Sequence, residues 1–474
     1  MCSTPISKEW VFMPNPGISV DPRLYISVPV TINFAGTNAN NPPIPPALPY
    51  NLLQNGSDAF RAFPISSVCS TLTIRLNNSA ASINLSDVIT SLLRYNTPHK
   101  VKEYDYSTCP CMQDYYQNYG EGGAQGNVSI ASQRNPLGWF GDNSWETTRG
   151  AFPYKYFINA PTTAAISAVI TEPLFLSPFL FGKGSELRNG FIGLQTLDLQ
   201  FTMSADLTRL WSHDASAGTI FTVPVNGAGM VVQFGQPAIL FNYISPKLLE
   251  PIPRAISYQY YVVDRFPTDN NSPILPNMSS TFSSNNIQMN TIPRRIYLFA
   301  RQRNSDQNVN STDTFLSLNN VTINYNNYSG LLASATPYDL YNISKKNGCN
   351  LSWPEWSGSP IVFGAGNAVV NDVGQSVYIN NSGVATLATN AVPLVGSVLC
   401  LDFGIDIGLD DLHSAGEIQN SQLQITATFT NINPTLAITA TFYIVTISEG
   451  IWTIENLNMQ KIFFVTISLF IFKE

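Results

Sequence analysis

The chain has 474 residues, of which 12% are charged and 12% are aromatic, and its formal net charge is −7. Soluble domains average about 25% charged residues, so this surface must be solvated largely by amide and hydroxyl groups. The negative charge argues against electrostatic wrapping of nucleic acid, and the 44% hydrophobic content argues against disorder.

The cysteines and arginines indicate no binding site. Only Cys109-Pro110-Cys111 is closely spaced, and it is neither a zinc knuckle nor a redox C-x-x-C motif, so we expect free thiols in a reducing compartment. The N-terminus lacks the apolar segment of a signal peptide. The densest basic cluster consists of Arg294, Arg295, Arg301 and Arg303. We expect these arginines to solvate the surface of a strand rather than to bind phosphate.

The first half of the chain predicts short β-strands. Segments rich in β-branched and aromatic residues occupy positions 10–13, 24–34 and 68–76. The proline-rich segment 38–49 cannot pair within a central strand, because proline lacks an N–H group, and we expect a loop there. A helix is predicted over residues 87–94, with Ser86 as its N-cap and Asp87 favourably placed for the helix dipole.

Residues 96–156 form a long stretch without periodicity, rich in Tyr, Gly, Asn and Pro. A segment of this length is not an ordinary connection, and its aromatic residues favour an ordered excursion from a sheet edge. We expect a first module over residues 1–245, which ends near the sequence SPKLLEPIP, and a second module over residues 246–450.

The second module contains strands and one further helix. The segment PRRIYLFARQ, residues 293–302, predicts a strong strand, and Thr336 and Pro337 are suited to the N-cap and first position of a helix over residues 337–345. In residues 396–409, apolar residues alternate through Phe403 and Ile405 to Leu409, which predicts that a strand continues through this segment.

One pattern in the first half is repeated in the second. Leu197 to Met203 and Leu423 to Phe429 both alternate apolar with polar residues, as half-buried strands do. These segments lie 226 residues apart, and the same spacing separates Leu72 from Leu298. We interpret the spacing as a duplication of two β-modules, each an antiparallel sandwich or jelly roll.

Few residues are suited to catalysis or metal binding. The histidines, His99, His213 and His413, lie in unrelated segments. The most suggestive cluster comprises Asp402, Asp406, Asp410, Asp411 and His413. On a strand, Asp402 and Asp406 would point to one face and could bind Ca²⁺ or act as paired carboxylates. A solvated strand face followed by a turn is the favoured interpretation, so we predict no catalytic, cofactor or metal site and no enzyme.

Two further segments receive structural interpretations. Tyr115, Tyr116 and Tyr119 are interpreted as packing within a loop rather than as a platform for sugars or bases, and the glycines of residues 120–126 as a flexible loop. The C-terminal tail, residues 451–474, contains an apolar run at 462–472 that is too short to span a bilayer, since a helix needs about 20 residues. We favour a terminal strand or an arm docked under another subunit over membrane contact.

Several blocks of sequence resemble one protein family. PRRIYLFARQ, LYNISKKNG, GSVLCLDFGIDIGL and NSQLQITATFTN resemble, in this order, the major capsid proteins of double jelly-roll DNA viruses, with the polinton-like virus, adintovirus and virophage group nearest. RNPLG, RGAFP and EPLFLSPF in the first module also resemble that group. The resemblance implies an all-β fold of two consecutive eight-stranded antiparallel jelly rolls, with long loops and a few short helices.

The resemblance also implies a function. Such proteins form homotrimers with a pseudo-hexameric outline, which tile an icosahedral virion shell around a DNA genome and are assembled inside the host cell. Their expected partners are further copies of the chain and penton and minor capsid proteins, without sequence-specific binding of nucleic acid. The alternatives that remain open are a carbohydrate-binding or spike-like β-sandwich, and a β-sandwich hydrolase, which would need converging carboxylates.

Overall fold

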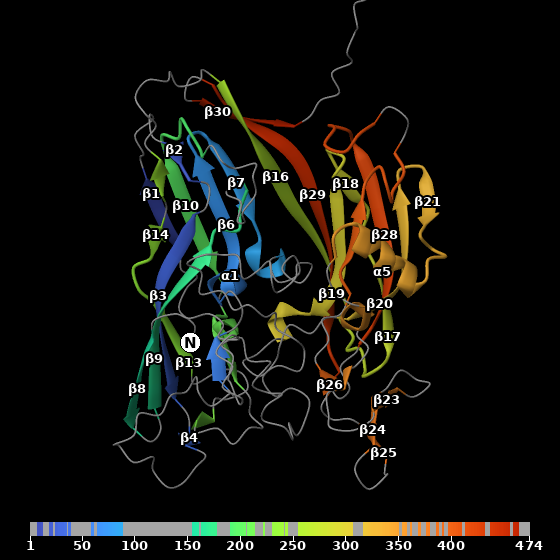
Figure 1. Ribbon diagram of the computed structural model, residues 1–474, viewed down its shortest axis with the longest axis horizontal. Coiled ribbons are helices and arrows are strands. Elements are labelled where there is room, and N and C mark those ends of the chain that lie inside the picture. Colours follow the sequence, from blue (N-terminus) through green and yellow to red (C-terminus); the bar gives the residue numbers. More distant parts are fainter. Residues whose placement is uncertain are drawn as a thin grey trace, which may run out of the picture.

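A computed structural model shows two β-sandwich modules that stand side by side (Figure 1). It describes residues 7–12, 19–21, 24–35, 37–38, 58–60, 64–88, 154–160, 163–177, 190–204, 206–213, 221–222, 230–240, 242–244, 255–306, 316–349, 353–357, 361–362, 368–370, 376–379, 385–387, 391–392, 397–409, 413–431, 437–455 and 458–463. Most of the expected excursion at 96–156 lies outside these residues.

The first module consists mainly of two sheets. Their strands span Ser7–Phe12 (β1), Tyr25–Ala35 (β3), Cys69–Leu76 (β6), Ser79–Ile83 (β7), Tyr154–Ala160 (β8), Thr163–Pro173 (β9), Leu197–Met203 (β10), Met230–Phe234 (β13) and Ala238–Leu240 (β14). One sheet has the order β1-β10-β6-β7 and the other β13-β3-β9-β8, with β14 also paired to β3.

Short elements complete the described part of the first module. They are Ser19–Val20 (β2), Thr37–Asn38 (β4), Asp58–Phe60 (β5), Pro64–Val68 (α1), Thr208–Leu210 (η5), Trp211–His213 (β11), Phe221–Thr222 (β12) and Tyr243–Ile244 (β15).

The second module has the same two-sheet plan. Its sheet strands span Ala255–Asp269 (β16), Ser279–Ser283 (β17), Ile287–Met289 (β18), Arg295–Gln302 (β19), Ser317–Tyr325 (β20), Tyr328–Leu331 (β21), Leu399–Asp402 (β27), Ser421–Thr430 (β28), Ala440–Glu455 (β29) and Asn458–Phe463 (β30). The orders are β16-β29-β19-β27 and β17-β28-β20-β21, with β30 paired to β29 and β18 to β28.

The second module also has helices and small sheets. They are Asn304–Asp306 (η6), Pro337–Lys346 (α5), Trp353–Ser357 (α6), Ile361–Val362 (β22), Ala368–Val370 (β23), Ser376–Ile379 (β24), Ala385–Leu387 (β25) and Ala391–Val392 (β26). The predicted N-cap of α5 is confirmed, because Thr336 and Asp339 form a reciprocal capping box.

The two modules are topologically equivalent in one sheet. β10 lies between β1 and β6, and β28 lies between β17/β18 and β20, so the match between Leu197 and Leu423 is confirmed. The match between Leu72 and Leu298 is wrong. Leu72 lies on β6, whose equivalent is β20, whereas Leu298 lies on β19 in the opposite sheet.

Two asparagine turns mark the correct equivalence. The hairpin β6–β7 turns at Asn77 and the hairpin β20–β21 at Asn326, both with positive φ (51° and 49°), as two-residue hairpin turns require. The side-chain oxygen of Asn77 accepts from the N–H of Thr196 (3.2 Å), and that of Asn326 accepts from the N–H of Gln422 (2.8 Å). Both asparagines therefore tie their hairpin to the start of the equivalent strand, β10 or β28.

Two predicted elements differ from the structure. The strand expected through residues 403–409 ends at Asp402, because Gly404 has φ +84° and a turn leaves Ile405 77% exposed. The helical turn after β7 begins at Leu85, so Ser86 lies inside it and is not its N-cap.

Candidate functional site at the junction between the modules

The carboxylates singled out in the sequence have separate structural roles. Asp402 accepts from Nε of Arg295, its cross-strand neighbour, at 2.7 Å. Asp406 accepts from the backbone N–H of Asp402 (2.9 Å) and from Nδ2 of Asn347 (2.6 Å), which stabilises the turn after β27. The two carboxylates are thus held by different donors and do not form an acid–base pair.

The other candidates do not assemble into a site either. Nδ1 of His413 lies 3.1 Å from Oε2 of Glu417. His213 contributes only backbone to the described structure, as part of β11. Outside the described residues lie His99, Asp410, Asp411, the tyrosines at 115, 116 and 119, the glycines at 120–126 and Cys109-Pro110-Cys111. In the described ranges no group of three or more His, Cys, Asp or Glu residues could hold a metal ion.

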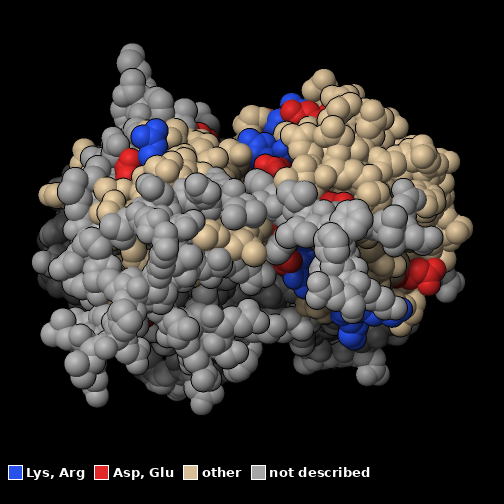
Figure 2. All heavy atoms as spheres, turned by 90° about the horizontal axis from the view of Figure 1, so that it is seen from above, with Lys and Arg blue, Asp and Glu red and all other residues tan. Residues whose placement is uncertain are grey.

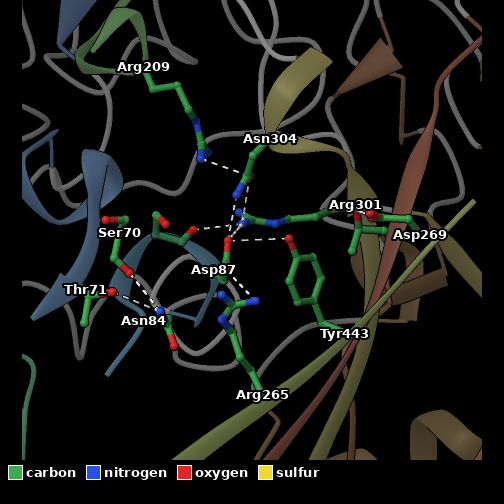
Figure 3. Close-up of polar contacts among 12 residues, drawn as sticks. Ser70, Thr71, Asn84, Asp87, Arg209, Arg265, Asp269, Arg301, Asn304 and Tyr443 are labelled. Carbon is green, nitrogen blue, oxygen red and sulfur yellow. Dashed lines mark hydrogen bonds and ion pairs between the residues drawn. The ribbon is translucent and has the colours of Figure 1, made fainter. Parts of the chain in front are cut away.

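The most elaborate polar arrangement lies instead between the two modules, around Asp87 (Figure 3). This carboxylate follows β7 of the first module and is 7% exposed. It pairs with NH1 of Arg265 on β16 at 2.9 Å and with NH2 of Arg301 on β19 at 3.4 Å. It also accepts from Nδ2 of Asn304 at 2.6 Å. One residue of the first module therefore contacts β16, β19 and η6 of the second, and it also accepts from the hydroxyl of Tyr443 on β29 at 3.5 Å.

Arg301 extends this network over the sheet face of the second module. Its guanidinium is fully buried and donates to the backbone oxygen of Ser86 (2.8 Å) and to Oδ1 of Asn304 (3.0 Å). It lies over the ring of Tyr443 on β29, 5.2 Å from the centroid, a cation–π contact that gains strength when desolvated. Arg209 of the first module donates to the same Asn304 oxygen at 3.1 Å.

The burial of Arg301 corrects the expectation that all four arginines solvate a surface. Arginine is almost never fully buried unless it is paired, and here the pairing partners come from residues more than 200 positions away. The signal in the sequence was the run Ile296 to Ala300, in which apolar residues occupy both faces of the strand. Such a run predicts a strand covered on both sides, so an arginine next to it was a candidate for burial.

A second set of contacts joins β16 to the first module. The hydroxyl of Tyr258 accepts from the N–H of Ile192 at 2.8 Å, and its ring packs edge-on against Phe191 with centroids 4.7 Å apart. The N–H of Tyr261 donates to Oγ of Ser177 at 2.9 Å. Burial raises the pKa of Tyr258, and the hydrogen bond from Ile192 acts in the opposite direction. The junction is therefore fixed at two separate places.

Within the first module, the buried carboxylate of Glu172 is held by backbone and side-chain donors of α1. Glu172 on β9 accepts from the N–H of Ile65 (2.7 Å) and from the N–H and hydroxyl of Ser66 (2.9 and 2.7 Å). Burial raises the pKa of Glu172 to about 7, against the opposing effect of these hydrogen bonds. Burial, followed by the charge of Glu172, raises the pKa of Cys69 to about 12. This thiol is inert, and Cys349 and Cys400 are likewise buried.

The described surface is sparsely charged. Among the coloured residues on the face seen in Figure 2, uncharged ones predominate, and Lys or Arg atoms lie near Asp or Glu atoms at several places. None of the helices in the described ranges is long and apolar enough to span a membrane. A surface with few charges suits burial against other protein chains, where charge is depleted.

Comparisons with known proteins agree with this architecture. Residues 2–244 match the family of the Sputnik virophage major capsid protein first domain, and residues 264–450 match that of the major capsid protein V20 C-terminal domain. The chain is 34% identical over 461 residues to the putative capsid protein V20 of Sputnik virophage. This alignment covers 95% of the chain and 72% of the relative.

Solved structures show the same similarity. A chain in the cryo-electron microscopy structure of the Sputnik virophage is 33% identical to this chain and superposes on it with a TM-score of 0.79. The alignment covers 97% of this chain and 86% of the virophage chain. The crystal structure of the mavirus major capsid protein is 15% identical to this chain and superposes on it with a TM-score of 0.72. The alignment covers 97% of this chain and 87% of the mavirus chain. The second similarity shows that the fold is shared.

Proposed function

The chain belongs to the Sputnik virophage major capsid protein family, and we propose that it forms trimeric, pseudo-hexameric capsomers that tile an icosahedral shell. Its role is structural rather than enzymatic, and its place is the capsid of a virion. The expected double jelly roll is confirmed by the two sandwiches and by the capsid proteins that share the fold.

The observation that carries the proposal is the pairing of two equivalent modules across a buried polar junction. The asparagine hairpins show that the modules share one plan, and the Asp87–Arg301 network fixes the angle between them. A threefold axis acting on a chain with two similar modules gives a closed ring of six modules, and each module forms one corner. The ion pairs and hydrogen bonds of the junction support the equivalence of these corners, which tiling requires.

The remaining parts of the proposal concern organisation and partners. We propose a division into residues 1–245 and 246–450, supported by the separate family matches to the two parts. The tail at 451–474 starts inside β29, and its first part pairs through β30 with that strand. Penton and minor capsid proteins would fill positions that a trimer cannot, and the enclosed DNA would be packaged without sequence-specific contacts.

Sedimentation velocity of the purified full-length chain tests the proposal. The expected species has three times the 52.0 kDa of one chain, and electron microscopy of the same sample should show threefold particles with a hexagonal outline. A monomer that binds glycans on an array would instead favour the carbohydrate-binding alternative and overturn the capsid assignment.

A further inference from the structure

One sheet face of the first module, formed by β13, β14, β3 and β9, faces away from the second module (Figure 1). Along β3, the inward side chains from Ile26 to Phe34 are buried, so the alternate residues point outward. The register places Val231 of β13 beside Asn33, Leu240 of β14 beside Tyr25, and Val169 of β9 beside Pro29. Over the described side chains of β13, β14, β3 and β9, no Lys, Arg, Asp or Glu points to this face.

This face also carries exposed apolar side chains. Val169, Val231 and Leu240 are 38%, 55% and 44% exposed, and they are the large hydrophobic residues exposed in the described part of the first module. Hydroxyl pairs lie between them, such as Thr31 with Ser167 at 2.9 Å. An uncharged surface with clustered aliphatic groups has the composition of an interface core.

The equivalent face of the second module is already covered within the chain. In that sheet Phe299 and Arg301 of β19 pair with Tyr443 and Thr441 of β29, and all four point toward the first module. They are covered by the residues that follow β7, where Ser86 and Asp87 contact Arg301. The internal junction therefore joins an edge hairpin and its following helical turn to a sheet face.

The second module has the same edge, and it is exposed. β21 is the equivalent of β7, and α5 follows it as the helical turn at 85–88 follows β7. Tyr328 on β21 and Tyr338 in the first turn of α5 are 43% and 55% exposed. Figure 1 places β21 and α5 at one lateral end of the molecule and β14, β3 and β9 at the other. Exposed tyrosines are typical anchors of protein interfaces.

We propose that the β13/β14-β3-β9 face of one copy binds the edge formed by β21 and the first turn of α5 in a second copy. The contact repeats, between chains, the junction that exists within each chain. Because the face and the edge lie at opposite ends of the molecule, the contact between two copies is head-to-tail. Three copies close into a ring in which internal junctions and intermolecular junctions follow one another in turn. The inference rests on the proposed trimer and names the surfaces that form it.

The first test places charge on the face. The double variant Val231→Asp, Leu240→Asp is expected to sediment as a folded monomer of 52.0 kDa, because two carboxylates would be desolvated without partners. Leu275→Asp is the matched control, since Leu275 is 58% exposed on the link between β16 and β17, away from the proposed face. The control is expected to remain trimeric, and circular dichroism checks that both proteins are folded.

The second test detects the contact directly and does not depend on the stability of the charged variant. Chains with Val231→Cys and chains with Tyr328→Cys are mixed, dissociated, reassembled and treated with a short bismaleimide. We expect covalent pairs from the mixture and none above wild-type background from either variant alone. A wild-type monomer would overturn the proposed function together with this inference. A wild-type trimer that tolerates both aspartates and gives no mixed cross-link would overturn only the assigned surfaces.

Discussion

Replacing Asp87 by alanine tests the junction between the modules. The substitution removes the carboxylate that pairs with Arg265 and Arg301 and that accepts from Asn304. Arg301 is fully buried, so its charge cannot be solvated by water after the carboxylate is lost. The chain would then hold a buried cation without its counter-ion across the interface of the two modules.

The expected loss of stability is about 3–4 kcal/mol. Removing one partner of a buried ion pair costs about 3–5 kcal/mol. The share from Arg265 is smaller, since its side chain is 28% exposed and exposed pairs contribute at most about 1 kcal/mol. Asp87→Asn also leaves Arg301 without its counter-ion but keeps an oxygen acceptor for Asn304, so its cost should be lower than that of Asp87→Ala by only about 1 kcal/mol, the contribution of one hydrogen bond.

Urea unfolding followed by fluorescence and circular dichroism provides the measurement. Arg294→Met is the matched control, because Arg294 pairs with Glu449 within the second module and is 48% exposed, so its loss should cost less than about 1 kcal/mol. In a double-mutant cycle, Asp87→Ala combined with Arg301→Met should cost at least about 1 kcal/mol less than the separate effects added together. Equal effects of Asp87→Ala and Arg294→Met, or strict additivity in the cycle, would refute the argument.

Three further predictions concern single positions. The folded pKa of Glu172 lies near 7 and its ordinary value is 4.5, so deprotonation destabilises the native state as pH rises from 4.5 to 7. Glu172→Gln should therefore gain stability relative to wild type over this window, by up to about 3 kcal/mol in urea titrations. A pH-independent difference between the two proteins would contradict this. Gly190→Ala should cost more than about 1 kcal/mol in thermal melts, since φ is +60° and a Cβ would lie 2.3 Å from Oγ of Ser19; an unchanged Tm would show that Ser19 yields. Thr336→Ala should cost about 1 kcal/mol through loss of the capping box, whereas Thr336→Ser should cost only a few tenths, and equal losses from both would count against capping.

The strands and the two-module plan could be predicted because alternation is a local property. β10, β28, β3 and α5 lie where the pattern of apolar residues and the capping residues placed them. The detailed equivalence could not be predicted from a constant spacing, since loops of different length separate the strands of the two modules. The Asn-Asn turns at Asn77 and Asn326 were a better guide than the spacing of Leu72 and Leu298.

The junction was missed for a different reason. Asp87 was assigned to a helix dipole and Arg301 to a strand surface, and each assignment was locally reasonable. Their pairing joins residues 214 positions apart, and a single sequence carries no signal for such a contact beyond the apolar run beside Arg301. The pair Asp402 and Asp406 shows the opposite error, since the positive φ of Gly404 ends the strand that would have placed them on one face.

Single-particle microscopy of the purified chain tests the central claim most directly. Two equivalent sandwiches held at a fixed angle should appear as threefold particles with six density lobes, in which lobes within a chain and lobes between chains meet in the same way. Particles that contain one copy, or rings in which the two kinds of junction differ in geometry, would contradict the account.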